Sequence, residues 1–161
     1  MQVMLDTAVK STRRIAADLR PLMLDDLGLL PAVEWLINNF TERTGVRCDF
    51  EVQPQEPDLH EPHATAVFRI LQESLANVAK HAHATLVEVT LSAVDGRLTL
   101  RVRDNGRGFD PAAPRNADSI GLVGLRERAH LLDGTITVDA APGKGVVIGV
   151  EIPLTPAEAN A

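Results

Sequence analysis

The sequence predicts an α+β protein, a two-layer sandwich in which helices cover one face of a mixed β-sheet, with an N-terminal helical segment. The first observation is that several stretches alternate apolar and polar residues with the period of a strand. The second is that other stretches repeat apolar residues with the 3.6-residue period of a helix. The third is their order, which contains hairpin-like strand pairs and lacks the repeated strand–helix–strand spacing of a parallel sheet.

Residues 1–20 contain no Gly or Pro and predict a helix. Its seam positions alternate four and three residues apart, as in helix bundles and coiled coils, and are Met1, Leu5, Ala8, Thr12, Ile15, Leu19 and Leu22. Two interpretations stay open: a surface helix packed on its own domain, or one part of an intermolecular bundle. Pro21 is expected to end this helix, and residues 22–30 are expected to form a connector.

The next predicted elements are a helix, a strand and a longer helix. Pro31 suits the first turn of a helix that Gly45 ends, and residues 46–52 alternate as a strand. A loop with three prolines, residues 53–62, precedes the longest clear helix, residues 63–82. The apolar positions that gather on one side of this helix are Val67, Phe68, Leu71, Leu75, Val78 and Ala82.

The second half of the chain predicts the rest of the sheet. Residues 86–94 and 97–104 are two strands joined by Asp95-Gly96, a dipeptide that favours a tight hairpin turn. Residues 105–119 form a long loop. The helix after it, residues 121–133, has an inner face made of Leu122, Leu125, Ala129 and Leu132. Strands around residues 136–138 and 146–152 complete the sheet, and the tail after Pro153 is expected to fray.

Composition excludes several classes of protein. The chain of 161 residues has 45% hydrophobic and 24% charged residues, which are ordinary values for a globular domain. Its net charge of −6 argues against nucleic acid as a partner, because nucleic-acid binding needs a basic surface. Lone Cys48 excludes an intrachain disulfide and suits the cytosol. No apolar run reaches the roughly 20 residues of a membrane span, and the N-terminus lacks the pattern of a signal peptide.

The helix predicted over residues 63–82 also has a polar face. The side chains that fall within about one quadrant of it, opposite the apolar set, are Glu73, Asn77, Lys80 and His81. An amide oxygen beside phosphate oxygens suits a hard cation such as Mg²⁺, and a lysine one turn further along can neutralise phosphate. For this helix taken alone, a solvated face is the simpler interpretation.

A second group of candidate residues lies at the end of the strand at 97–104. Asp104 is in phase with the apolar residues of the strand, so its carboxylate points inward and needs a partner. A ligand amino group suits it, because an ionised carboxylate can only accept hydrogen bonds. Gly106 and Gly108 follow and permit close backbone approach. The alternative is an aspartate that caps an ordinary turn.

A third group of residues begins the helix after the long loop. Gly121 and Gly124 lie at its N-terminus, where backbone N–H groups can bind an anion, and the loop before them has the character of a phosphate lid. A further Gly-x-Gly, Gly143 and Gly145, leads into the last strand. The order of these groups is more specific than any one of them. The chain contains neither a P-loop nor a dinucleotide-binding glycine motif.

In this order the motifs resemble those of the ATP-binding catalytic domain of sensor histidine kinases, a fold shared with gyrase, Hsp90 and MutL ATPases. The resemblance is closer to the kinase subfamily whose response regulators carry helix-turn-helix output domains. Residues 72–82 match the N box, residues 104–109 the G1 box, and residues 121–128 the box that ends the lid. Residues 19–21 and 24–29 resemble the segment between the dimerisation helix and the catalytic domain.

The resemblance implies a role for each matched residue. Asn77 would bind Mg²⁺, and Glu73 would be the polar or basic partner near the γ-phosphate of ATP. Lys80 and His81 would face phosphate, and Asp104 would accept a hydrogen bond from the adenine amino group. The remaining nucleotide-binding positions would be Gly106, Gly108, Gly121, Leu122, Gly124, Gly143 and Gly145.

Two departures from the family pattern concern the base contact and the phosphoacceptor. Val146 stands where the family often has Thr near the adenine, which puts a water-mediated base contact in doubt. The acceptor pair, His followed by Asp, is absent, and His60-Glu61 is rejected because Pro62 follows it in a loop. The other histidines lack partners at metal-ligand spacing; they are His63, His83 and His130.

The prediction is therefore a piece of a sensor histidine kinase that binds Mg²⁺-ATP and transfers the γ-phosphoryl group to a histidine outside this chain, for relay to a response regulator. The expected parts are a dimerisation helix (1–22), a connector (23–30), the catalytic domain (31–154) and a frayed tail (155–161). This chain is expected in the cytoplasm, and its parent is expected to be a homodimer that is anchored in the membrane through segments outside this chain. This chain alone is not expected to autophosphorylate. Two alternatives stay open: an ATP hydrolase of the same fold with Glu73 as its base, and a non-catalytic, nucleotide-dependent dimerisation module.

Overall fold

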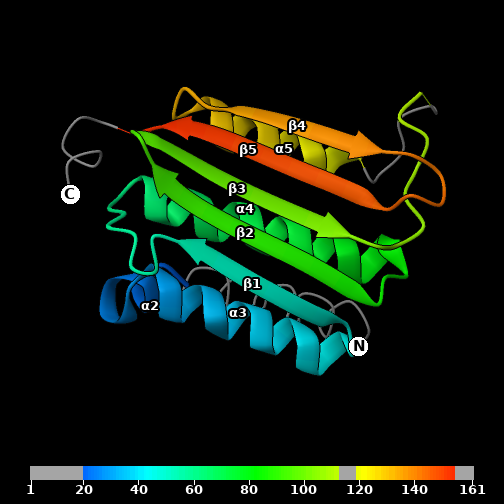
Figure 1. Ribbon diagram of the computed structural model, residues 1–161, viewed down its shortest axis with the longest axis horizontal. Helices are drawn as coiled ribbons and strands as arrows, with labels where there is room; N and C mark the ends of the chain where they lie inside the picture. The colour runs from blue at the N-terminus through cyan, green and yellow to red at the C-terminus, as the bar shows by residue number, and fades with distance from the viewer. Residues whose placement is uncertain (1–19, 113–118, 155–161) are drawn as a thin grey trace, which may run out of the picture.

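The computed structural model describes residues 20–112 and 119–154, which form an open five-stranded sheet with helices on one face (Figure 1). The strands are β1 (Arg47–Gln53), β2 (Leu86–Val94), β3 (Arg97–Asp104), β4 (Thr135–Ala140) and β5 (Val146–Pro153). Their order in the sheet is β1-β2-β3-β5-β4. β1 and β2 are parallel, and the other neighbours are antiparallel. The predicted α+β class with a mixed sheet is confirmed.

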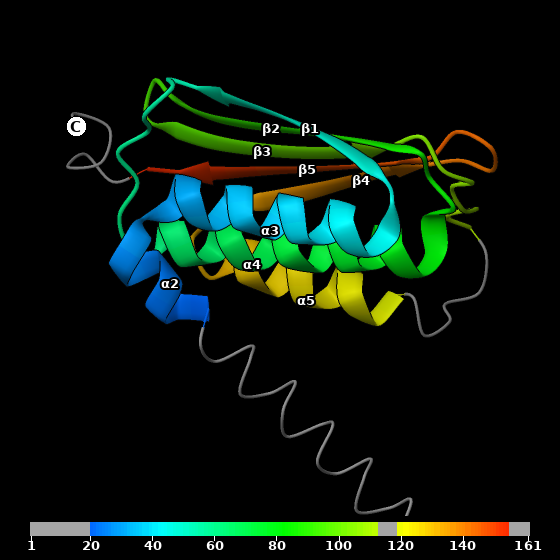
Figure 2. The same cartoon turned by 90° about the horizontal axis from the view of Figure 1, so that it is seen from below.

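The helical layer lies against one face of this sheet. The helices are α2 (Arg20–Leu27), α3 (Leu29–Thr44), α4 (His63–Asn77), the π-helix η1 (Val78–Ala82) and α5 (Ser119–His130). Figure 2 shows α3, α4 and α5 side by side beneath the sheet, with α2 packed below them. In the described ranges no helix is both long enough and apolar enough to span a bilayer.

The beginning of the described chain differs from the prediction. Residues 20–27 form α2, with Pro21 near its start, so the stretch expected to be a connector is helical as far as Gly28. Gly28 has a φ of 86°, a left-handed conformation that glycine adopts at little cost and that separates α2 from α3. The helix and seam predicted for residues 1–19, and the tail from residue 155, lie outside the described residues.

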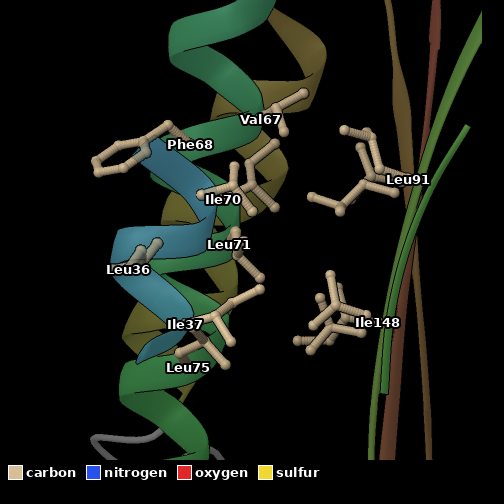
Figure 3. Close-up of a cluster of buried hydrophobic side chains, with 14 of the residues drawn as sticks. Leu36, Ile37, Val67, Phe68, Ile70, Leu71, Leu75, Leu91 and Ile148 are labelled. Atoms are coloured by element: carbon tan, nitrogen blue, oxygen red, sulfur yellow. The ribbon is translucent and has the colours of Figure 1, made fainter. Parts of the chain in front are cut away.

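The central helix α4 owes its position to its apolar face. All the positions predicted to face the core are buried, namely Val67, Phe68, Leu71, Leu75, Val78 and Ala82. Figure 3 shows Leu71 pointing from α4 toward Leu91 and Ile148 of the sheet. Complete burial of a side chain of this size contributes about 1.5–3 kcal/mol, so packing on the sheet fixes the rotation of α4 about its axis. Its polar face is therefore fixed as well.

Two features of the chain around β2 and β3 position the candidate site. Asp95 and Gly96 have φ values of 54° and 71°, as the predicted hairpin turn requires, and the register then places Asp104 opposite Val87 on the inner face. The helix predicted over residues 63–82 is α-helical only to Asn77 and continues as η1. π-helical turns are rare in proteins, and those that occur often lie at functional sites.

Cys48 in β1 gives a prediction about the edge of the sheet. Burial, with a smaller contribution from the Asp49 carboxylate, raises the pKa of the Cys48 thiol to about 11. The thiolate is the reactive form, so iodoacetamide should alkylate the native protein at pH 8 about 200-fold more slowly than the urea-unfolded chain. The native rate should rise about tenfold per pH unit from pH 8 to pH 10. Equal rates for the native and the unfolded chain would contradict this, and Cys48→Ser serves as the unlabelled control.

Candidate functional site

Segments that are far apart in the sequence meet at one end of the sheet. They are the end of β3, the end of α4 with η1, the start of α5 and the turn between β4 and β5, all on the right in Figure 2. Asp104 is the last residue of β3, and Asn77 is the last residue of α4. The topology thus brings together the residue groups that the sequence analysis identified separately.

Asp104 is a buried carboxylate at this end of the sheet. It is 6% exposed, which confirms its predicted inward position. Its Oδ1 accepts a hydrogen bond from the N–H of Gly106 at 2.8 Å. Within the described ranges its other oxygen, Oδ2, has no hydrogen-bond partner. Burying a carboxylate is costly unless its oxygens are bonded, so Oδ2 is suited to a donor group of a ligand.

The glycines around Asp104 occupy places where no side chain fits. A Cβ at Gly106 would collide with the backbone oxygen of Ala82, and one at Gly145 with the backbone oxygen of Asp104. A Cβ at Gly108 would also collide with a backbone oxygen. Gly108 and Gly145 have φ values of 63° and 70°, which other residues rarely adopt. The close backbone approach predicted for Gly106 and Gly108 is confirmed, and Gly145 shares it.

A second group of polar atoms lies where α4 meets α5. A Cβ at Gly121 would lie 2.8 Å from Oε1 of Glu73 and 3.1 Å from Oδ1 of Asn77. Glu73 and Asn77 therefore share a face, as predicted, and Gly121 lets the start of α5 approach both oxygens. The structure gives no such packing reason for Gly124, because no atom lies within 4 Å of its would-be Cβ. Leu122 is half-buried against the core.

The cationic candidates lie just beyond this group, in η1. Lys80 is exposed, and His81 is half-buried with its carbonyl oxygen bonded to Nε of Arg107 at 2.6 Å. Positive charge at the C-terminal end of a helix is favourable in itself, so the Lys80 side chain suits this helix end even without a bound anion. Gly143 has a φ of 75° in an otherwise open turn. Residues 113–118 of the predicted lid lie outside the described part of the chain.

The oxygens on α4 suit one kind of metal ion. Among the described residues, no three His, Cys, Asp or Glu side chains are grouped so that they could hold a metal ion. Asn77 and Glu73 instead offer oxygen ligands, which Mg²⁺ prefers, and protein-bound Mg²⁺ commonly takes its other ligands from water and substrate phosphates. The donor set thus fits a magnesium ion that arrives with a nucleotide.

The structural role of Asn105 is not apparent from the local sequence pattern. Its Oδ1 accepts hydrogen bonds from the N–H groups of Thr85 and Leu86 at 2.9 and 3.0 Å. Its Nδ2 donates to Oγ1 of Thr85 at 2.8 Å. This side chain joins the end of β3 to the start of β2 and so fixes the turn that carries Asp104. A short amide side chain directly after a strand indicates a turn. Its hydrogen-bond partners, however, lie 20 residues earlier and cannot be found from local pattern.

Residues 63–156 match the family described as histidine kinase-, DNA gyrase B-, and HSP90-like ATPase. The chain belongs to this family. The matched range begins with α4 and includes Asp104, Gly106, Gly121 and Gly145. The predicted fold class and the predicted family are confirmed together.

Curated relatives extend the similarity to nearly the whole chain. The histidine-protein kinase/phosphatase DegS of Brevibacillus brevis is 36% identical over 158 residues, which cover 98% of this chain and 41% of that protein. The oxygen sensor histidine kinase NreB of Staphylococcus carnosus is 31% identical over 147 residues, with 91% and 42% coverage. The crystal structure of full-length ShkA has a TM-score of 0.65 at 25% identity and covers 78% of this chain and 29% of that one. This chain spans about two fifths of the length of these curated relatives.

Proposed function

We propose that this chain binds Mg²⁺-ATP and transfers its γ-phosphoryl group to a histidine outside the chain, as the catalytic part of a sensor histidine kinase. The observation that carries the proposal is the buried carboxylate of Asp104, whose Oδ2 is left for a donor. Beside it, Gly106 packs against the backbone of Ala82 and Gly145 against the backbone of Asp104, and these positions without side chains would leave room for a flat base. The relatives DegS and NreB are named histidine kinases, and the ShkA structure is titled as a complex with AMPPNP, a non-hydrolysable ATP analogue.

The adenine end of the nucleotide is assigned to Asp104. Its carboxylate would accept the hydrogen bond of the exocyclic amino group, a donor that adenine has and guanine lacks at that position. The glycine backbone at residues 106, 108, 143 and 145 would form the pocket wall. Because this contact is to the base and not to the reacting phosphate, it contributes binding and orientation.

The phosphate end is assigned to α4, η1 and the start of α5. Asn77 would hold the magnesium ion, which supplies neutralisation of phosphate charge. Lys80 would add positive charge, and His81 would face the phosphates beside it. The backbone of Gly121, Leu122 and Gly124 would close over the phosphates from the N-terminal end of α5.

In the reaction a nitrogen of the acceptor imidazole forms a bond to the γ-phosphorus while the bond from that phosphorus to the β–γ bridging oxygen breaks, and ADP leaves. The imidazole N–H proton must be removed. Glu73 is the proposed acceptor of that proton, because its carboxylate lies beside Asn77. Such a transfer depends mainly on positioning and on neutralising charge, which are the tasks assigned to these residues.

The partners follow from this proposal. They are the helix of the parent kinase that carries the acceptor histidine, a second copy of the parent, and a response regulator with a helix-turn-helix output domain. Residues 1–22 are proposed to belong to the dimerisation region, residues 23–30 to the connector, and residues 31–154 to the catalytic domain. Since the proposed substrate is ATP, we place this part of the parent in the cytoplasm.

Calorimetric titration with AMPPNP, with and without Mg²⁺, tests the nucleotide site. Binding that strengthens with Mg²⁺ supports the proposal, and no binding under either condition refutes it. Radiolabelled ATP and a separately added acceptor-helix protein then test the transfer. Label on the acceptor histidine supports kinase activity, whereas steady phosphate release without any acceptor indicates an ATP hydrolase of the same fold.

Asn77→Ala is expected to remove the magnesium dependence of binding. The variant should bind AMPPNP in the presence of Mg²⁺ about as weakly as the unchanged protein binds it in EDTA, because the amide oxygen that holds the ion is gone. Asn38→Ala, an exposed change on α3, is the matched control and should keep the full magnesium effect. An Asn77→Ala protein that still responds fully to Mg²⁺ would remove Asn77 from the metal site.

A further inference from the structure

Arg107 joins three segments of the chain at the candidate site. Its backbone N–H donates to the carbonyl oxygen of Ala82 at 2.7 Å, and its Nε donates to that of His81 at 2.6 Å. Its own carbonyl oxygen accepts a hydrogen bond from the N–H of Gly143 at 2.6 Å. The loop after β3 is therefore bonded both to the end of η1 and to the turn between β4 and β5.

The two bonds to η1 act at a weak point of that helix. The last carbonyls of a helix have no helical donors, and η1 ends at once because His83 takes a left-handed φ of 52°. Arg107 supplies donors to two successive carbonyls there. Its guanidinium charge is also favourable at the negative end of a helix. The two contacts together cap the π-helical turn of η1 at its last two residues.

This cap lies between the two halves of the proposed site. Lys80, assigned to phosphate, belongs to the turn that Arg107 caps. The Gly143 turn on the other side leads to Gly145, whose backbone lies against Asp104. We propose that Arg107 is a positioning residue that fixes the end of η1 and thereby directs Lys80 toward the nucleotide phosphates; this inference rests on the proposed nucleotide site.

Arg107→Ala separates the side-chain contact from the backbone contacts. It removes the Nε bond to His81 and keeps the N–H and carbonyl bonds of residue 107. We expect affinity for AMPPNP to fall about tenfold and affinity for adenosine to stay unchanged, because the side chain acts on the phosphate side only. Without nucleotide, amide hydrogen exchange at residues 80–82 should speed up about tenfold while the urea midpoint stays unchanged.

The control is Arg103→Ala, which removes an exposed arginine of β3 that is paired with Glu88 at 3.8 Å and should change none of these quantities. Unchanged exchange at residues 80–82 in Arg107→Ala would overturn the inference by itself. A uniform loss of adenosine affinity, AMPPNP affinity and stability would also overturn it, since that result describes a general structural role. If the unchanged protein bound neither adenosine nor AMPPNP, the proposed function would fail, and the phosphate-directing part of this inference with it.

Discussion

Asp104→Asn is expected to weaken ATP binding by at least about 30-fold, which corresponds to about 2 kcal/mol. Asparagine has nearly the shape of aspartate, so it fits the buried position and its oxygen can still accept the hydrogen bond from Gly106. The atom in the place of Oδ2 then becomes an amide nitrogen, which is a donor facing the donor of the adenine amino group. Two donors facing each other across a buried contact repel, and the charge assistance of the carboxylate is lost as well.

Base selectivity separates this effect from simple damage to the fold. The unchanged protein should prefer ATP to GTP, because guanine presents an oxygen to the carboxylate. Asp104→Asn should lose that preference, because its amide can donate to this oxygen. Competition calorimetry with both nucleotides measures the ratio. Asp95→Asn, the same substitution in the exposed turn at the other end of β3, should leave the ratio unchanged. Equal ATP affinity for the unchanged protein and Asp104→Asn would exclude Asp104 as the adenine contact.

The parts of the fold that sequence predicted are those determined by local pattern. The apolar face of α4 follows from helical period, and the β2–β3 hairpin follows from Asp95-Gly96, which readily takes the positive φ values that the turn needs. Asp104 could be placed inward because side chains alternate along a strand. These inferences need only neighbouring residues, and the structure bears out each of them.

The parts that sequence did not predict depend on contacts between distant segments. Residues expected to form a connector instead form α2, which contains Pro21 near its start, and the positive φ of Gly28 separates this helix from α3. The π-helical turn of η1 is bonded to Arg107. Its sequence does not differ from that of an ordinary helix end, so the turn could not be predicted from local pattern. Asn105 joins the ends of β3 and β2 through its hydrogen bond to Thr85. A site built by such long-range bonds can be recognised from its motif, but its supporting residues are identified only in three dimensions.

Gly145→Ala is expected to be strongly destabilising, and Gly143→Ala in the same turn is its matched control. Both glycines have positive φ, 70° and 75°, so an alanine at either position incurs a backbone penalty of about 1 kcal/mol. Only at residue 145 would the new Cβ also collide with the backbone oxygen of Asp104, and it would come within 3.2 Å of Oδ1 of the same residue. At residue 143 no atom lies within 4 Å.

The difference between the unfolding free energies lost in these two variants measures the effect of the collision alone. No side-chain rotation relieves a contact between a Cβ and a backbone oxygen, so the end of β3 or the turn must move. We therefore expect Gly145→Ala to lower the free energy of unfolding by about 3 kcal/mol or more, and Gly143→Ala by about 1 kcal/mol. Urea unfolding of both proteins gives the two values. Equal losses of unfolding free energy would show that the turn moves without strain and that Gly145 is required only for its φ. A larger loss at residue 145, with a matching loss of AMPPNP affinity, would show that close backbone contact holds Asp104 in place.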